Sequence, residues 1–158
     1  MIVYVMRHDE AQSMSPDGDS GRRLTDEGRR RAEATGRGFV AEGHRVSAIV
    51  SSPFARTMET VECFLRGSGF SITADADRRL ASGARPEAMM EVIQESEGPL
   101  LLVGHMPDVA ELTAWLISGG AETRVSFGTG TIACIRFLGS PRPGSGTLCW
   151  MRMASQWP

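Results

Sequence analysis

Three short apolar runs recur along the chain at wide intervals, and they restrict its fold more than any other feature of the sequence. The runs are residues 2–6, 48–51 and 100–103. Each has the length of a strand and is apolar at nearly every position, which is typical of strands covered on both faces. Helix-like segments separate them. The sequence therefore predicts an α/β fold, a three-layer sandwich with a mainly parallel central sheet and helices on both faces.

Helical signals lie between these runs. Thr25 is a suitable N-cap because acidic residues follow it in the first turn, and Gly43 suits the end of that helix. Later segments predict helices over residues 53–66, 86–95 and 108–117. Residues 71–74 are expected to form a short edge strand.

The last two strand-like segments are residues 131–137 and 147–153, with a loop rich in Pro, Gly and Ser between them. This arrangement predicts a C-terminal antiparallel hairpin. The chain has 158 residues, enough for one core of ordinary size, and shows no internal repeat, low-complexity tract or linker. We therefore expect a single domain over residues 1–158.

Charge and hydropathy exclude several partners. A net charge of -2 and a pI near 5.9 provide no whole-molecule attraction for nucleic acid or an anionic membrane. The run Arg29-Arg30-Arg31 lies near acidic residues on the first predicted helix, so we expect a solvated, salt-bridged face there. No window approaches the roughly eighteen apolar residues of a membrane helix, and no basic leader precedes the first run. We expect a cytoplasmic monomer that binds neither nucleic acid nor membrane.

All seventeen basic residues are arginines. The absence of lysine excludes a Walker A loop, a Schiff-base lysine and a pyridoxal phosphate anchor. Cys63, Cys134 and Cys149 form no C-x-x-C pair, and none begins a C-x5-R phosphate loop. Reduced thiols are therefore expected.

Residues suited to phosphate chemistry follow the three apolar runs. Arg7 and His8 follow the first run, Arg56 lies shortly after the second, and His105 comes after the third. Ligands of parallel α/β sheets bind beyond the carboxyl ends of the strands, so these side chains are expected to meet there. Arginine offers paired donors that match phosphate oxygens, and a neutral imidazole can attack phosphorus. The pattern predicts a phosphoryl site. Without a zinc signature such as H-E-x-x-H, we expect no metal and no cofactor.

Five segments occur in the order found in one known family. They are residues 6–11 (MRHDEA), 22–28 (RRLTDEG), 51–60 (SSPFARTMET), 104–107 (GHMP) and 127–133 (FGTGTIA). They resemble the R-H-G or R-H-x-x-A, R-P-L-T-x-x-G, S-S-P-x-x-R-A-x-Q-T, G-H-N-P and F-P-T-G-x-x-A segments of the histidine phosphatase superfamily. The resemblance is to its SixA-type phosphohistidine phosphatases and spans nearly the whole chain. It implies one histidine phosphatase domain without a large cap insertion.

The resemblance also implies roles for residues of these segments. His8 would be the phosphorylated nucleophile, and three residues would form the phosphate pocket with it: Arg7, Arg56 and His105. Arg22 is either a substrate contact or a solvated loop arginine. Three further residues either line the pocket or form turns: Ser52, Thr129 and Gly130.

Two departures from the family pattern concern acidic residues. Asp9 stands where relatives carry Gly or Ala beside the nucleophile, so it could orient His8, donate a proton or point away. The glutamate that larger members carry before the second-histidine motif is missing, since residues 79–83 read RLASG. Asp9 and Glu10 are the possible proton donors, and the further acidic candidates are Asp17, Asp19 and Glu87.

The predicted reaction is hydrolysis of a phosphoryl group through a phosphorylated His8. A phosphoramidate demands less from an enzyme acid than an alkyl phosphate does, and the short stretch between Arg56 and His105 leaves no room for a helical cap. Phosphohistidine on a protein, such as a phosphorelay domain, is therefore the expected substrate. Two alternatives stay open: a small-molecule phosphomonoesterase on the same fold, and a non-catalytic phosphate-binding regulatory module.

Overall fold

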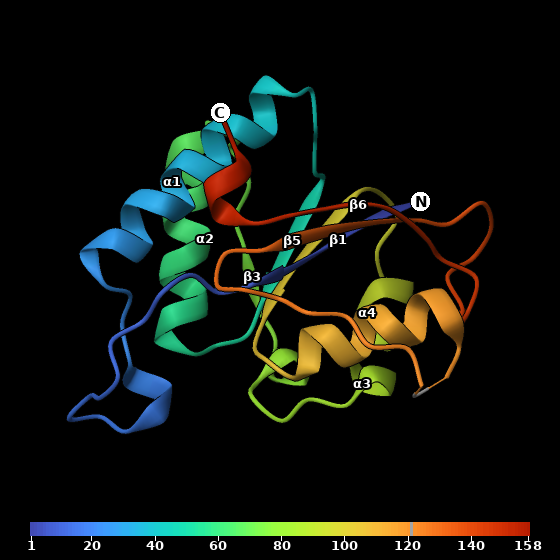
Figure 1. The fold of residues 1–158 in the computed structure, drawn as a ribbon, viewed down its shortest axis with the longest axis horizontal. Coiled ribbons are helices and arrows are strands. Elements are labelled where there is room, and N and C mark those ends of the chain that lie inside the picture. The colour runs from blue at the N-terminus through green and yellow to red at the C-terminus, as the bar shows by residue number, and fades with distance from the viewer. Residues whose placement is uncertain (121) are drawn as a thin grey trace.

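The apolar runs pair side by side in a six-stranded sheet (Figure 1), as shown by the computed structural model, which describes residues 1–120 and 122–158. The strand order is β3-β2-β4-β1-β5-β6. The strands are β1 (Ile2–Arg7), β2 (Ala48–Ser51), β3 (Asp75–Ala76), β4 (Leu100–Gly104), β5 (Ile132–Arg136) and β6 (Thr147–Arg152). The first four strands pair in parallel, whereas β5 runs antiparallel to β1 and β6 runs antiparallel to β5. The predicted mainly parallel sheet with a closing hairpin is confirmed.

Successive side chains of the central strands point to opposite faces of the sheet and enter two separate cores. On β1, Val3 and Val5 lie in one core, whereas Tyr4 and Met6 lie in the other. The first core is covered by α3 (Pro86–Gln94) and α4 (Asp108–Ser118), and the second by α1 (Asp26–Ala41) and α2 (Ala55–Ser68) (Figure 1). The three layers predicted from the sequence are therefore present.

Helices α1 and α2 approach each other closely through glycine. A Cβ atom at Gly36 of α1 would collide with the backbone of Phe64, and one at Gly67 of α2 would collide with the backbone of Glu33. Glycine is required at both positions because the two helix backbones meet there. The close contact fixes the relative position of two helices that both supply arginines to the candidate site.

The ends of α1 agree with the prediction. The hydroxyl of Thr25 accepts a hydrogen bond from the backbone N–H of Gly28, and the helix ends two residues before Gly43. Thr25 thus satisfies one of the N–H groups that a helix start leaves without a partner. In the part of the chain that the structure describes, no helix is both long and apolar enough to cross a bilayer.

Two other predicted boundaries are wrong. Helix α2 begins at Ala55 and not at Pro53, because the hydroxyl of Ser52 accepts a hydrogen bond from the backbone N–H of Phe54 and holds these residues in a turn. The edge strand β3 lies at Asp75–Ala76 and not at residues 71–74, because the later residues are the ones that pair with the end of β2.

The carboxyl ends of β1, β2 and β4 lie at one edge of the sheet. Arg7 at the end of β1 is opposite Gly104 of β4, and the backbone N–H of His8 donates to the carbonyl of Gly104 at 3.0 Å. The backbone N–H of Ser52, just beyond β2, donates to the carbonyl of Val103 at 3.0 Å. The residues that end the three apolar runs are thus neighbours in space.

Candidate active site

Three side chains from different strand ends lie in contact at this edge. The Nε–H of Arg56 donates to Nε2 of His8 at 3.2 Å, and the ring centroids of His8 and His105 are 5.4 Å apart. His8 follows β1, Arg56 lies in the first turn of α2, and His105 follows β4. All three are buried, with exposed fractions of 7%, 4% and 1% in the order His8, Arg56 and His105. The strand ends therefore bring together the residues that the sequence analysis grouped.

Two hydrogen bonds determine where the His8 ring carries its proton. Nδ1 lies 2.6 Å from the backbone carbonyl oxygen of Asp9, and because a carbonyl can only accept, Nδ1 is the protonated nitrogen. Nε2 faces the guanidinium of Arg56, which can only donate. His8 is therefore a neutral imidazole whose lone pair is on Nε2, the nitrogen that can act as a nucleophile.

Burial and neighbouring arginines keep both imidazoles neutral. The pKa of His8 is lowered to about 4, chiefly by desolvation and further by the charges of Arg56 and Arg7, although the hydrogen bond to Asp9 opposes this shift. The pKa of His105 is lowered to about 3, first by desolvation and then by Arg56. At neutral pH the site thus holds two uncharged rings beside cationic guanidiniums, an arrangement that favours an anionic ligand.

His105 is held in place by the turn between β2 and α2. Its Nε2 lies 2.7 Å from the hydroxyl oxygen of Ser52, and the ring of Phe54 packs against it edge to face with centroids 5.0 Å apart. The buried Nδ1 of His105 has no hydrogen-bond partner within the described residues. Buried polar nitrogens are rarely left without a partner, so this atom is available to bind a ligand.

Arg7 supplies a second guanidinium next to the nucleophile. Its Nη1 donates to the carbonyl of Phe127 at 2.9 Å, while its buried Nε has no partner among the described residues. Desolvation lowers the pKa of Arg7, but the side chain stays charged because the ordinary pKa of arginine lies far above neutrality. Arg7 therefore retains an unused donor beside His8.

Arg56 has a second partner, Asp19, in the loop that precedes α1. Its Nη1 donates to the carbonyl oxygen of Asp19 at 2.7 Å, and its Nη2 lies 3.2 Å from Oδ2 of the same residue. Nη1 of Arg22 donates to the other carboxylate oxygen at 3.0 Å. Hydrogen bonds from Arg22 and then Arg56 lower the pKa of Asp19. Arg22, whose role was open, is thus linked to the site through Asp19.

Asp9 is completely buried beside the nucleophile. Its Oδ1 accepts from the backbone N–H of Glu10 at 2.7 Å and lies 3.1 Å from Nη2 of Arg31, whereas its Oδ2 has no hydrogen-bond partner in the described residues. Desolvation raises the pKa of Asp9, and Arg31 opposes that shift. The contact between Asp9 and the His8 ring is made by the backbone carbonyl and not by the carboxylate.

Arg31 belongs to this site, and its assignment to a solvated face is wrong. Besides the ion pair with Asp9, its Nη2 donates to the carbonyl oxygen of Thr129 at 3.0 Å and to the hydroxyl of Thr129 at 3.1 Å. Arg31 lies on the buried face of α1, since Gly28 and Thr35, three and four positions away on that face, are buried. Arg30, by contrast, is exposed and pairs with Glu27 as predicted.

Thr129 and Gly130 contact the residues that support His8. The backbone N–H of Gly130 donates to the carbonyl of His8 at 3.1 Å. Gly130 has a φ of 71°, and a Cβ atom there would collide with Oδ2 of Asp9, so the position requires glycine for two reasons. These two residues therefore join the segment before β5 to the nucleophile loop.

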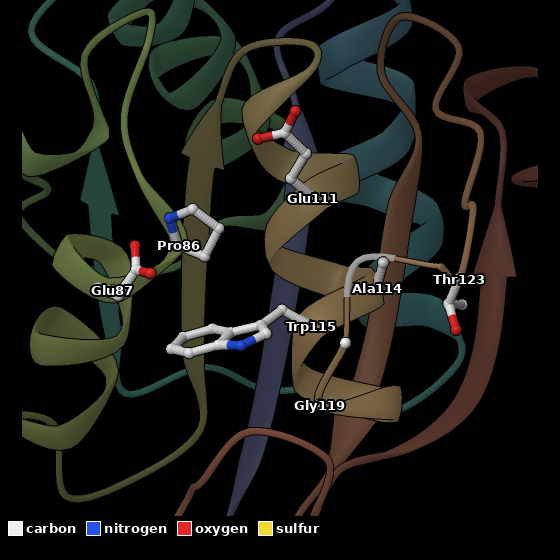
Figure 2. Close-up of a pocket in the computed structure, with 8 residues that line it drawn as sticks. Pro86, Glu87, Glu111, Ala114, Trp115, Gly119 and Thr123 are labelled. Carbon is white, nitrogen blue, oxygen red and sulfur yellow. The ribbon is translucent and has the colours of Figure 1, made fainter.

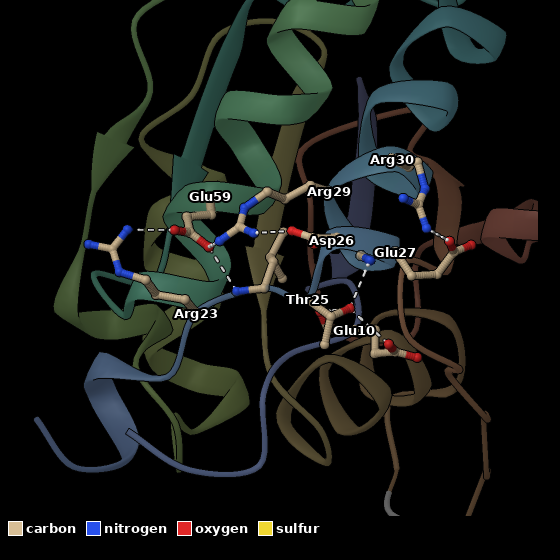
Figure 3. A network of polar contacts seen from close by, with 10 residues as sticks. Glu10, Arg23, Thr25, Asp26, Glu27, Arg29, Arg30 and Glu59 are labelled. Atoms are coloured by element: carbon tan, nitrogen blue, oxygen red, sulfur yellow. Dashed lines mark hydrogen bonds and ion pairs between the residues drawn. The ribbon is translucent and has the colours of Figure 1, made fainter. Parts of the chain in front are cut away.

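The other acidic candidates lie apart from His8. Oε1 of Glu10 accepts from the hydroxyl of Thr25 at 2.8 Å at the start of α1 (Figure 3), and Asp17 is exposed in the preceding loop. Glu87 lines a separate cavity of about 380 Å³ beside Trp115 (Figure 2). None of these three carboxylates is hydrogen-bonded to His8, Arg56 or His105 in the described residues. The described part of the chain contains no group of three or more His, Cys, Asp or Glu side chains that could hold a metal ion.

Comparisons with known proteins find one family and several similar solved structures. A family model described as the histidine phosphatase superfamily (branch 1) matches residues 3–82. The structure of the protein histidine phosphatase SixA complexed with tungstate superposes with a TM-score of 0.88 at 26% identity, covering 98% of both chains. SixA proteins from Agrobacterium tumefaciens and Nakamurella multipartitia give TM-scores of 0.79 and 0.78 at 22% and 21% identity, covering 96% of this chain and 97% and 95% of theirs. No curated protein gives a significant sequence match.

Proposed function

The chain belongs to the histidine phosphatase superfamily, and from this premise we propose that it is a phosphatase that hydrolyses phosphoryl groups through a covalent phosphohistidine at His8. The observation that carries the proposal is the state of the His8 ring, which is neutral, protonated at Nδ1 and hydrogen-bonded to Arg56 at Nε2. The similar SixA protein was solved with tungstate, a tetrahedral oxyanion like phosphate, which supports an oxyanion pocket in this family.

In the first step, Nε2 of His8 attacks phosphorus and the bond between phosphorus and the leaving group breaks. The imidazole of a phosphohistidine substrate that is already protonated leaves as neutral imidazole. The carbonyl of Asp9 holds the proton on Nδ1 and so keeps the lone pair on the attacking nitrogen. Arg7 and Arg56 bind the phosphoryl oxygens, and Nδ1 of His105 can donate to a third oxygen when Ser52 donates to Nε2. These donors stabilise the charge on the oxygens as the phosphoryl group moves.

In the second step, a water molecule attacks the phosphorus atom and the bond to Nε2 of His8 breaks. The same arginines hold the oxygens, and the water passes one proton to the surroundings as phosphate forms. Arginine is the source of positive charge in both steps, so the proposed reaction needs no metal ion. A neutral His8 is regenerated because its low pKa disfavours protonation at neutral pH.

The proposed substrate is phosphohistidine on a protein, such as a cytoplasmic phosphorelay domain. The leaving imidazole of a phosphoramidate needs less acid assistance than an alkoxide, and the described carboxylates bound at the site are Asp9 and Asp19, neither of which contacts the His8 ring through its carboxylate. Between Arg56 and His105 the chain forms α2, β3, a short 3-10 turn, α3 and β4, which leaves no inserted cap in this described segment. We take the chain to be a single domain with an open site.

The test is replacement of His8 by Asn, with phosphate release from a phosphohistidine protein and acid-quenched labelling as readouts. We expect turnover to fall by about 10³-fold or more and the covalent label to disappear, because the attacking nitrogen is lost. His44→Asn is the matched control, since His44 lies in an aromatic cluster with Phe39 and Trp150 away from the site. The control variant is expected to keep full labelling.

Three results would contradict parts of this proposal. Label retained in His8→Asn would refute the nucleophile. Similar kcat/KM values for a phosphohistidine protein and for sugar phosphates would favour a small-molecule phosphomonoesterase, whereas we expect a preference of about 10²-fold for the phosphoramidate. A wild-type protein that binds vanadate but releases phosphate from no substrate would be a regulatory binding module.

A further inference from the structure

Every donor nitrogen of Arg56 is engaged by a group of the protein itself. Nε donates to Nε2 of His8 at 3.2 Å, Nη1 donates to the carbonyl of Asp19 at 2.7 Å, and Nη2 lies 3.2 Å from Oδ2 of Asp19. The Arg56 side chain is 5% exposed and therefore has little access to water. The N–H groups directed at His8 and Asp19 can bind a phosphoryl oxygen only if that oxygen takes the place of these partners.

The Asp19 carboxylate is bound as a phosphate group would be. Its two oxygens lie on two different arginines, Oδ2 on Arg56 and Oδ1 on Arg22, at 3.2 and 3.0 Å. Paired guanidinium donors are the usual ligands of phosphate oxygens. One carboxylate thus uses donors from Arg56, which the proposed function assigns to the phosphoryl group, and from Arg22, the candidate substrate contact of the sequence.

Asp19 can leave this position without disturbing the core. The loop that carries it is fastened at its base, where the backbone N–H of Gln12 donates to Arg23, and Arg23 and the N–H of Leu24 bind Glu59 of α2 (Figure 3). Residues 16–20 above this base are exposed, and the Asp19 side chain keeps 57% of its surface accessible. Several hydrogen bonds thus hold the base of the loop, whereas residues 16–20 are attached to the rest of the molecule chiefly through the contacts of Asp19 with Arg56.

We propose that Asp19 is an intramolecular competitor for the phosphoryl group, which displaces the Asp19 carboxylate from Arg56 and Arg22 when substrate binds. This inference rests on the proposed function, because it assumes that these arginines receive a phosphoryl group. A dianionic phosphoryl group has more charge and more acceptor oxygens than one carboxylate, so it wins the exchange. Displacement also allows Arg56 to turn from Nε2 of His8 toward the ligand, which frees the nucleophile's lone pair. Asp19 therefore sets the affinity of the site for anions.

The experiment compares the binding of inorganic phosphate and of tungstate to the full-length wild-type chain, Asp19→Asn and Asp19→Ala by calorimetric titration. Both substitutions remove the competing charge, so in each variant we expect the dissociation constants of phosphate and tungstate to fall about tenfold. A tenfold change corresponds to an Asp19 carboxylate that occupies the wild-type site nine-tenths of the time. Asp17→Asn is the matched control, because it removes one negative charge from the same exposed loop at a residue without an ion pair to either arginine in the described structure. Its dissociation constants should stay within about twofold of wild type, since exposed charges at a distance are screened.

Two outcomes distinguish failure of this inference from failure of the proposed function. In the first, the wild type binds tungstate, and Asp19→Asn and Asp19→Ala bind it equally or more weakly. Asp19 then organises the arginines and does not compete, so the inference is overturned while the proposed function stands. If the wild type neither binds either oxyanion nor releases phosphate, the proposed function fails and the inference fails with it. A fall in the dissociation constants of Asp17→Asn as large as that of Asp19→Asn would show a general effect of loop charge. It would also overturn the inference that Asp19 competes with the phosphoryl group.

Discussion

Asp9 and Asp19 both pair with an arginine close to His8, but they lie in opposite surroundings. Asp9 is fully buried, desolvation raises its pKa, and one of its oxygens has no hydrogen-bond partner in the described residues. Asp19 keeps more than half of its side chain exposed, and hydrogen bonds from Arg22 and Arg56 lower its pKa. The first carboxylate is costly to bury and the second is stabilised where it stands.

Asp9 and Asp19 mark two sides of His8, which we call the supporting side and the ligand side. On the supporting side, Asp9, Arg31 and Thr129 connect three segments that are far apart in the chain, and none of these contacts uses Nε2 of His8. On the ligand side, Asp19 binds the guanidinium that faces Nε2. A fully buried carboxylate that loses its ionic partner costs much stability, whereas the Asp19 carboxylate, more than half exposed, can return to water when a ligand takes its arginines.

Arg56 is the residue on which the ligand side depends most, and its loss should have the largest effect. For Arg56→Ala we expect kcat/KM to fall by about 10³-fold, because a guanidinium that stabilises a transferring phosphoryl group is worth that much or more. Steady-state phosphate release measures it. Arg66→Ala is the control, since Arg66 lies exposed near the other end of α2 and pairs with Glu33. A loss of less than tenfold in Arg56→Ala would mean that Arg56 is not a ligand of the transferring group.

Arg31 tests the supporting side, where the effect should be on stability. Arg31→Ala leaves the buried Asp9 carboxylate without its ionic partner, and we expect it to cost about 3 kcal/mol of unfolding free energy at pH 7. Without Arg31 the pKa of folded Asp9 rises further above its unfolded value, so the folded variant takes up a proton first as pH falls. The deficit should therefore shrink between pH 7 and pH 5.

Arg30→Ala is the neighbouring control for this prediction. Arg30 pairs with Glu27, and its side chain is 72% exposed, so its removal should cost no more than about 0.5 kcal/mol. Denaturant titrations of both variants at the two pH values supply the comparison. Equal losses in Arg30→Ala and Arg31→Ala, or a deficit for Arg31→Ala that grows toward pH 5, would contradict a buried pair with Asp9.

The sequence predicts the ligand side better than the supporting side, for a physical reason. The carboxyl ends of parallel strands align whatever lies between them, so apolar runs followed by His8 and His105 are enough to place these rings together. The Arg31–Thr129 contact joins residues 98 positions apart, and local charge patterns equally allow Arg31 to pair along its own helix. The contact of Asp19 with Arg56 depends on the path of an exposed loop, which no periodic pattern encodes.

His105 predicts how stability depends on pH on the ligand side, because its ring stays neutral over the pH range in which Asp19 stays charged. The folded pKa of His105 is about 3, while the unfolded value is about 6.5, so the unfolded chain binds a proton in that interval that the folded chain refuses. Stability is therefore lost as pH falls below about 6.5. Relative to His105→Gln, the wild type should lose roughly 2 kcal/mol more between pH 7 and pH 5. Parallel pH dependences for the two proteins would show that His105 titrates normally.

Thr129→Val carries the smallest expected effect and decides on which side of His8 this residue acts. Valine removes the hydroxyl that accepts from Arg31, while the backbone carbonyl keeps its own hydrogen bond from the same guanidinium. We expect a loss of about 1 kcal/mol in unfolding free energy, and a KM within about twofold of wild type, because Thr129 acts through Arg31 and Asp9. Thermal or denaturant unfolding together with steady-state kinetics measures both quantities. A KM raised fivefold or more at unchanged stability would instead place the Thr129 hydroxyl on the substrate, as its position in the late family segment first suggested.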